Sequence, residues 1–132
     1  MSKAQNYIAW GLQVVASIIL LQTLYFKFSA QPESIYIFSK LGVEPYGRIG
    51  SGIIELIAGI LLLTPRFSWA GALIAAGVMV GAILSHLTIL GVEVQGDHGE
   101  LFILALVVLF AALAILFLRR KEIPIVKNYF AN

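Results

Sequence analysis

The stretch GRIGSGIIELIAGILLLTP, residues 47–65, decides the fold. Most of it reads as a helix compatible with lipid, yet Glu55 lies near its middle and Arg48 lies seven residues earlier. An ionisable side chain inside a membrane span costs about 3 kcal/mol on insertion scales, so such residues usually face the bundle interior and pair. We therefore expect Glu55 to point inward and to be neutralised by a cation, with Arg48 and Lys27 as the leading candidates.

The composition indicates a lipid bilayer as the surroundings of this chain. Its 132 residues are 60% hydrophobic and 12% charged, whereas a soluble domain carries about 25% charge. The chain has no cysteine, which excludes disulfides, thiolate metal sites and CxxC redox chemistry. A net charge of +2 does not indicate a nucleic-acid partner.

Four segments are long and apolar enough to span a membrane, which takes about 20 residues as a helix. They cover residues 7–26, 46–63, 69–90 and 101–118, separated by turn-forming residues such as Pro65 and Gly96. A cleaved signal peptide is not expected, because the first apolar run is long and is interrupted by Gln13 and Gln22. The sequence predicts an all-α membrane protein, a four-transmembrane-helix bundle forming one membrane domain over residues 1–132.

The basic residues set the predicted orientation. An even number of spans places both termini and the 64–68 loop on one side, which then holds six of the nine basic residues: Lys3, Arg66, Arg119, Arg120, Lys121 and Lys127. Positive residues favour the cytoplasmic side. We expect a multi-pass protein of the bacterial inner membrane with both termini, including a basic tail at 119–132, in the cytoplasm.

The connection between the first two spans contains a helix of its own. Pro32 and Glu33 suit a first helical turn, and Gly42 suits the residue just past a helix end. Apolar residues recur between them at helical spacing, so we expect a short amphipathic helix at about 32–41 in the outer interface. It either caps the bundle or simply covers its surface.

Small residues predict where helices pack closely. Gly77, Gly81 and Ser85 lie four apart on the third span, and Gly52 and Gly59 lie on the second. Such spacing allows helix backbones to approach each other. We expect the ridge at 77, 81 and 85 to be a close-packed face.

Polar residues gather in the predicted outer half of the bundle. The main candidates for a ligand site or buried network are Glu55, Arg48, Lys27, His86 and Gln22, and the secondary candidates are Asp97, His98, Glu100, Tyr25 and Tyr46. Three interpretations stay open: a structural network, a cavity that binds a polar headgroup or quinone ring, and part of a proton or ion path. Intramembrane polar groups serve all three purposes.

Other kinds of site find little support. No pair of His, Asp or Glu has metal-ligand spacing on one helix, so no metal site is expected. GRIGSG begins a membrane span and follows no strand, so it is not a phosphate-binding loop. The sequence holds no self-contained catalytic constellation, and whether the chain is an enzyme stays undecided.

Three segments carry a resemblance to a known family: FKF at 26–28, PYGRIGSGIIELIAGILLLTPR at 45–66 and SHLTILGVEVQGDHG at 85–99. With them the chain resembles the DoxX family of small four-helix bacterial membrane proteins. The resemblance implies a membrane-embedded bundle linked to redox chemistry, with a quinone as the candidate cofactor. It implies Lys27, Arg48 and Glu55 as the positions of any shared site.

Two functions from different classes follow. In the first, the chain is a redox-linked accessory subunit that holds a quinone or lipid-like ligand beside a membrane or redox protein partner. In the second, it is a non-enzymatic binding or assembly module whose polar cluster is structural, and self-association into a homo-oligomer stays open. A ligand-sized cavity lined by Glu55, His86 and an aromatic residue such as Tyr25 or Tyr46 favours the first, and a filled bundle favours the second.

Overall fold

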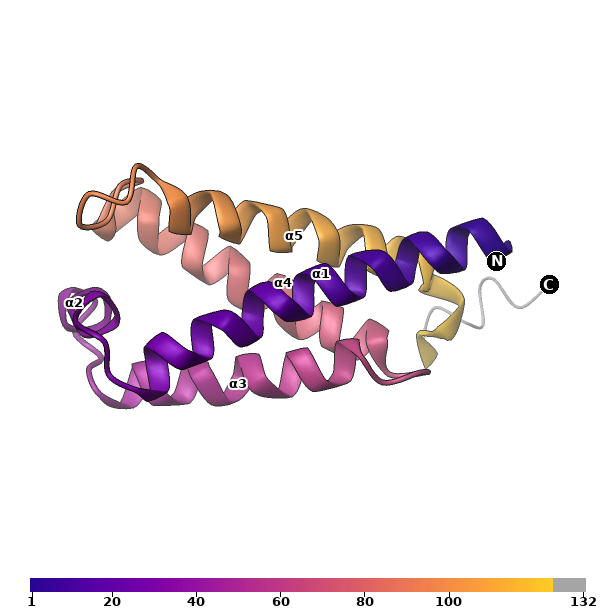
Figure 1. Cartoon of the computed structure of the whole chain (residues 1–132), viewed down its shortest axis with the longest axis horizontal. Helices are drawn as coiled ribbons and strands as arrows, with labels where there is room; N and C mark the ends of the chain where they lie inside the picture. The colour runs from indigo at the N-terminus through magenta and orange to yellow at the C-terminus, as the bar shows by residue number, and fades with distance from the viewer. Residues whose placement is uncertain (125–132) are drawn as a thin grey trace.

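The computed structural model describes residues 1–124 as helices joined by short connections (Figure 1). A π-helical turn, His86–Leu90, extends the fourth helix, and a 3-10 turn, Arg120–Glu122, follows the fifth. This part of the chain contains no strand and five α-helices: α1 (Lys3–Phe28), α2 (Pro32–Lys40), α3 (Tyr46–Leu62), α4 (Ser68–Ser85) and α5 (Glu100–Leu118). The end of the predicted tail, including Lys127, lies outside the described residues.

Three of these helices are long and apolar enough to cross a membrane, judged by length and composition. They are α1, α4 together with its π-helical turn, and α5. The fourth predicted span corresponds to α3, which has 17 residues. Its bounds, Tyr46–Leu62, lie within one residue of the predicted segment 46–63.

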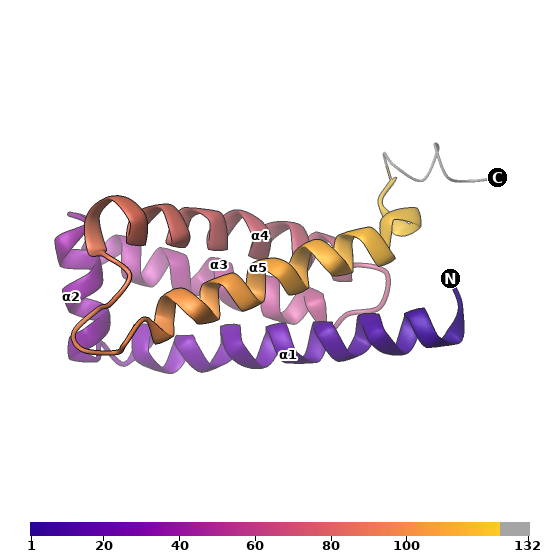
Figure 2. The same ribbon diagram turned by 90° about the horizontal axis from the view of Figure 1, so that it is seen from above.

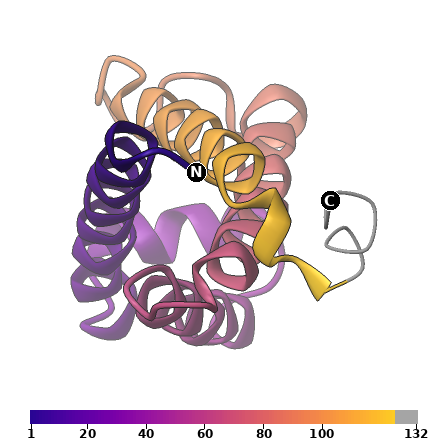
Figure 3. The same ribbon diagram turned by 90° about the vertical axis from the view of Figure 1, so that its right-hand side faces the viewer.

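The four long helices form a bundle in which each contacts two neighbours: α1 packs on α3, α3 on α4, α4 on α5 and α5 on α1. Figure 3 shows this closed arrangement along the bundle axis. Small side chains fill the core, because alanine lets helices approach closely. The members of the packed core cluster that are at most 1% exposed are Ala16, Leu20, Ala58, Leu62, Ala72, Ala75, Val108, Ala112 and Ile115.

The bundle has two different ends. The N-terminus and the end of α5 lie at one end, here called the termini end, and α2 lies across the other, here called the α2 end (Figures 1 and 2). At the α2 end the α1–α3 pair lies apart from the α4–α5 pair, with α2 between them (Figure 1). At the termini end the two pairs converge.

Small residues pack closely at Gly52 and Gly59, as predicted for the second span, and also at Gly71, which was not singled out from the sequence. A Cβ atom added at Gly71 would lie 2.6 Å from the backbone nitrogen of Leu62 and 2.7 Å from the carbonyl oxygen of Ala58, so α4 meets α3 backbone to backbone near the termini end. Gly52 packs against the ring of Phe28 on α1.

The predicted ridge on α4 is not a packed face within this chain, and that prediction is wrong here. A Cβ atom added at Gly77 or Gly81 would meet nothing within 4 Å. Spacing alone shows that three small residues share a face of a helix, but the crossing angle of the bundle decides which face is covered.

The short helix predicted at about 32–41 is present as α2. Pro32 occupies its first turn with Glu33 beside it, and Gly42 follows its end with a φ of +78°, a conformation that glycine adopts without strain. Ser34 is buried, and Ile37, Phe38 and Leu41 are partly covered. The helix therefore lays one face across the end of the bundle.

Candidate functional site

A cavity of about 500 Å³ occupies the space between the two helix pairs at the α2 end. All five α-helices contribute to its walls. The part nearest the middle of the bundle is apolar, with Leu20, Met79, Ala105 and Val108. Ionisable groups line the remainder, and they are Lys27, Glu33, Glu55, His86, Asp97 and Glu100. The cavity thus has an apolar interior and a polar region toward α2.

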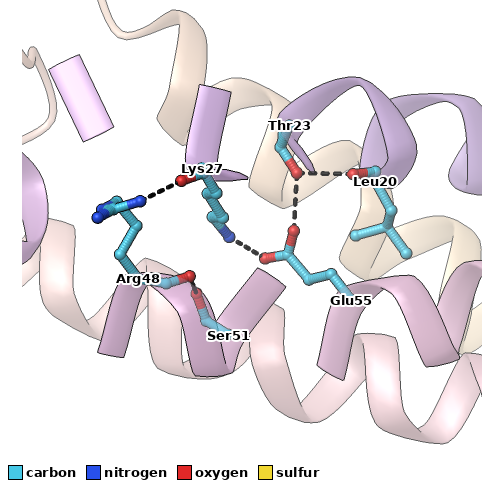
Figure 4. Close-up of polar contacts among 6 residues, drawn as sticks. All are labelled: Leu20, Thr23, Lys27, Arg48, Ser51 and Glu55. Atoms are coloured by element: carbon cyan, nitrogen blue, oxygen red, sulfur yellow. Dashed lines mark hydrogen bonds and ion pairs between the residues drawn. The ribbon is translucent and has the colours of Figure 1, made fainter. Parts of the chain in front are cut away.

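Glu55 points inward from α3 and pairs with α1 (Figure 4). Its carboxylate is 3% exposed, and one oxygen accepts a hydrogen bond from the ammonium of Lys27. The other oxygen lies 2.7 Å from the hydroxyl of Thr23. That hydroxyl is also 2.7 Å from the carbonyl oxygen of Leu20, so its single hydrogen serves one acceptor at a time. Of the two cations that the sequence offered, Lys27 is the partner of Glu55.

Arg48 has other partners. Its Nε donates to both carboxylate oxygens of Glu44, at 2.8 and 3.1 Å, and a terminal nitrogen donates to the carbonyl oxygen of Lys27 (Figure 4). The Arg48 side chain is 9% exposed and does not line the cavity. It ties the last turn of α1 to the start of α3, and thereby positions Lys27.

His86 is the first residue of the π-helical turn that extends α4, and it is 5% exposed. Its Nδ1 lies 2.9 Å from the carbonyl oxygen of Gly91, and its ring packs edge-on against Phe102 with centroids 5.6 Å apart. An oxygen acceptor at Nδ1 means that Nδ1 carries the hydrogen in the neutral ring, which leaves Nε2 as an acceptor. Nε2 has no hydrogen-bond partner among the described residues, and His86 lines the cavity.

Three carboxylates surround the α2 end of the cavity. Asp97 precedes α5, and its side chain accepts hydrogen bonds from the backbone N–H groups of Val94, Gly99 and Leu101 at 2.9 to 3.2 Å. Burial raises the pKa of Asp97, but these hydrogen bonds and the nearby His86 outweigh it and hold the pKa below its ordinary value.

The pKa of Glu33 moves in the opposite direction. Burial raises it above the ordinary value, and the negative charges of Asp97 and Glu100 raise it further. Glu33 is therefore close enough to Asp97 and to Glu100 to be repelled by each of them. No ion pair of Glu33 or Glu100 occurs within residues 1–124.

The remaining candidate residues lie elsewhere or at the edge. Gln22 lines the cavity but is largely exposed. Tyr25 and Tyr46 are 65% and 86% exposed and do not line it. The side chain of His98 is 92% exposed, 3.9 Å from Glu93. The aromatic residues of the cavity are Phe26 and Phe38 instead.

Sequence reasoning also missed a second polar cluster, at the termini end. Arg119 is 7% exposed, and its guanidinium donates to Gln13 at 2.7 Å, Asn6 at 3.1 Å and Glu122 at 3.1 Å. The amide of Gln13 in turn donates to the carbonyl oxygen of Leu62 at 2.8 Å. This cluster, here called the Arg119 clamp, joins α1, α3 and α5. The signal for it was Gln13, which interrupts the first apolar run of the sequence.

Among residues 1–124, no group of three or more His, Cys, Asp or Glu side chains is arranged to hold a metal ion. Comparisons with family models, with curated proteins and with solved structures gave no match. The DoxX resemblance therefore stays a prediction from the quoted segments, and the cavity has to be interpreted from its own chemistry.

Proposed function

We propose that this chain is a DoxX-like integral membrane protein that binds an amphiphile, a quinone or lipid-like molecule, in the cavity at its α2 end. The observation that supports this is the polarity of the cavity: an apolar interior of Leu20, Met79, Ala105 and Val108, with Lys27, Glu55 and His86 toward α2. A molecule with a tail and a headgroup matches both regions. Ligand sites typically occupy about 300–1,000 Å³, which includes the volume found here.

The proposal includes four membrane spans. At 1.5 Å per residue, the 17 residues of α3 cover about 26 Å, slightly less than the roughly 30 Å of a bilayer core. Spans of that length are accommodated by local thinning of the bilayer. The outward face of α3 is apolar, with Ile53, Ile57 and Ile60 about half exposed. Such a continuous apolar face is suited to lipid rather than water.

The proposed orientation places both termini in the cytoplasm of a bacterial inner membrane, with the α2 end outside. Because the chain has no cysteine, single-cysteine variants test this directly. Lys40→Cys on α2 and Glu93→Cys in the 91–99 loop should react with a membrane-impermeant maleimide in intact cells. Arg66→Cys should react only after lysis. Labelling of Arg66→Cys in intact cells would contradict a spanning α3.

A ligand in this cavity suits an accessory subunit, since the chain brings no redox group of its own. In that role the protein holds a quinone or lipid-like molecule beside a membrane or redox partner. The alternative is an assembly module whose polar residues are structural, and the hydrogen bonds within the Lys27–Glu55–Thr23 group are consistent with it. The cavity favours the binding function, because a network that only locks helices together needs no adjoining space.

Mass spectrometry of the organic extract from gently purified protein tests the binding function. Gly81 lines the cavity, and a side chain added there meets open space, so Gly81→Leu should narrow the cavity without disturbing the fold. Gly77→Leu is the matched control, one turn away on the same helix, equally open and outside the cavity. Glu55→Gln removes the charge that Lys27 neutralises.

We expect one amphiphile per chain in the wild type and in Gly77→Leu, and loss of it in Gly81→Leu and in Glu55→Gln. Retention of the same molecule in Gly81→Leu would place it outside the cavity and contradict the proposal. An extract in which no amphiphile approaches one copy per chain would favour the assembly module.

A further inference from the structure

Negative charges outnumber positive charges in the lining of the cavity, and this limits the kinds of headgroup that a ligand can have. The ionisable side chains other than His86 comprise four carboxylates and one ammonium. Glu55 already accepts from the ammonium of Lys27, so these two neutralise each other. Glu33, Asp97 and Glu100 remain, and among the described residues none of the three forms an ion pair with a cation.

The three remaining carboxylates also differ in how their oxygens are used. Asp97 is satisfied by three backbone N–H groups. Glu33 and Glu100 have no hydrogen-bond donor among residues 1–124, although Glu33 is partly buried. The raised pKa of Glu33, caused by burial and by the two neighbouring carboxylates, is consistent with an acidic region that no cation of the chain relieves.

An acceptor that is accessible from the cavity adjoins this acidic region. Nε2 of His86 belongs to a side chain that is 5% exposed, and it lacks a donor within the described part of the chain. The neutral polar groups of the cavity, such as the Gln22 amide and the Ser34 hydroxyl, both donate and accept, so they introduce no preference. The free carboxylates favour a ligand with positive charge, and Nε2 of His86 favours a ligand with a hydrogen-bond donor.

We infer that the cavity selects an amphiphile with a cationic, hydrogen-bond-donating headgroup, a primary ammonium, over neutral and anionic amphiphiles of the same chain length. The inference rests on the proposed binding function and specifies its ligand class. A primary ammonium has three donors and a compact charge, which suits two free carboxylates and the Nε2 acceptor of His86.

Other headgroups fit these groups less well. An anionic headgroup would add a fourth negative charge beside Glu33, Asp97 and Glu100. An oxidised quinone offers only carbonyl acceptors, so it leaves the carboxylates of Glu33 and Glu100 and the Nε2 acceptor of His86 without a donor. Of the two ligand classes proposed above, the charge distribution therefore favours a lipid-like amine.

The test compares four probes with the same alkyl chain: dodecylamine, dodecyltrimethylammonium, dodecanol and dodecanoate. Each is titrated into the full chain in a mild detergent and followed by calorimetry. A titration into detergent without protein gives the contribution from the micelle, and the same titration on Gly81→Leu, whose cavity is narrowed, shows which binding depends on the cavity. Glu33→Gln with Glu100→Gln removes the two free carboxylates, and Glu93→Gln is a matched control because Glu93 is exposed and outside the cavity.

We expect dodecylamine to bind at least about tenfold more tightly than dodecanoate, since each partly exposed charge pair changes affinity by a factor of roughly two to five. Dodecanol should lie between them, and dodecyltrimethylammonium should bind more weakly than dodecylamine because it has no N–H donor. The double variant should reduce the difference between amine and carboxylate to about threefold or less, and Glu93→Gln should leave it unchanged.

The failures of the two proposals are distinguishable. Equal or tighter binding of dodecanoate, lost in Gly81→Leu, would overturn the charge selection and leave the binding function intact. A difference between amine and carboxylate that persists in the double variant would also overturn it. Binding of every probe that is unaffected by Gly81→Leu, or binding of none, would overturn the binding function itself.

Discussion

Removing the ammonium of Lys27 tests the internal pairing of Glu55 most directly. In Lys27→Met the carboxylate of Glu55, 3% exposed, keeps only the hydroxyl of Thr23 at 2.7 Å as a hydrogen-bond donor. Loss of one partner of a buried ion pair costs about 3–5 kcal/mol. The retained hydrogen bond to a charged group is worth about 1.5–3 kcal/mol, so we expect a loss near the lower limit, about 3 kcal/mol.

The assay is equilibrium unfolding of the detergent-solubilised chain with increasing sodium dodecyl sulfate, followed by helical circular dichroism. Lys40→Met is the matched control, because Lys40 is exposed on α2 and lies near the Tyr36 hydroxyl at 3.3 Å. It should change stability by about 0.5 kcal/mol or less.

A second substitution separates charge from packing. Glu55→Leu added to Lys27→Met removes the uncompensated carboxylate, so the double variant should regain most of the loss. The reasoning is refuted if Lys27→Met costs less than about 1 kcal/mol, which is the range of an exposed pair. It is also refuted if the double variant is no more stable than the single one.

Three further predictions use the same unfolding assay. Gly71→Ala should destabilise the fold by about 1–3 kcal/mol, because the added Cβ would press into the backbone of α3. Gly77→Ala, on an open face, should stabilise the fold by up to about 1 kcal/mol through helix propensity. Equal effects of the two substitutions would contradict the close contact at Gly71. Gln13→Leu should cost about 2 kcal/mol by leaving buried donors of the Arg119 clamp unpaired, whereas Gln22→Leu should stay within about 0.5 kcal/mol. The lowered pKa of Asp97 means that its carboxylate stabilises the fold above the unfolded pKa of about 3.9 and that this contribution is lost as the pH falls through the folded pKa. Asp97→Asn should therefore be less stable than the wild type at pH 7, with a difference that shrinks as the pH falls below the unfolded pKa of about 3.9. A difference that does not change with pH would contradict the assignment.

The positions of the helices could be predicted from the sequence because apolar runs and turn residues act locally. Pro32 and Gly42 bounded α2 almost to the residue, and Glu55 faces inward as the cost of exposing a charge to lipid requires. The π-helical turn after α4 was not predicted. Its residues continue the apolar pattern of the helix, so nothing in the sequence marks the change of hydrogen bonding.

Pairings between helices were less predictable, because they depend on rotation and crossing angle. Arg48 shares a face with Glu55, but Glu44 lies four residues before it, and that spacing brings a carboxylate and a guanidinium together at the start of a helix. The local pair formed, and Lys27, from another helix, was left for Glu55. The spacing of Glu44 and Arg48 is visible in the sequence. It was overlooked because Glu55, inside an apolar segment, was the carboxylate that most needed a partner.

The Arg119 clamp shows the same limit over a longer distance. Arg119 and Gln13 are 106 residues apart, and Arg119 reads as one of several basic residues that follow an apolar segment. Only the packing of α1 against α5 in the structure shows that Arg119 is the buried one of these basic residues. The cavity could not be predicted from the sequence either. Its apolar lining residues are of the same types as those that fill the core, and only the crossing angles of the helices leave a space between them.

The helix pairs α1–α3 and α4–α5, here called the arms, are joined at the termini end, here called the pivot, and lie apart at the α2 end (Figure 1). The Arg119 clamp and the Gly71 contact join helices near the pivot, and Figure 1 shows the two arms, α1–α3 and α4–α5, diverging from it. The 18 residues of α4 form a lever of about 27 Å, so a rotation of about 5° about the pivot moves the far end by about 2 Å. The width of the space between the arms is therefore more sensitive to their crossing angle at the α2 end than at the contacts of the termini end.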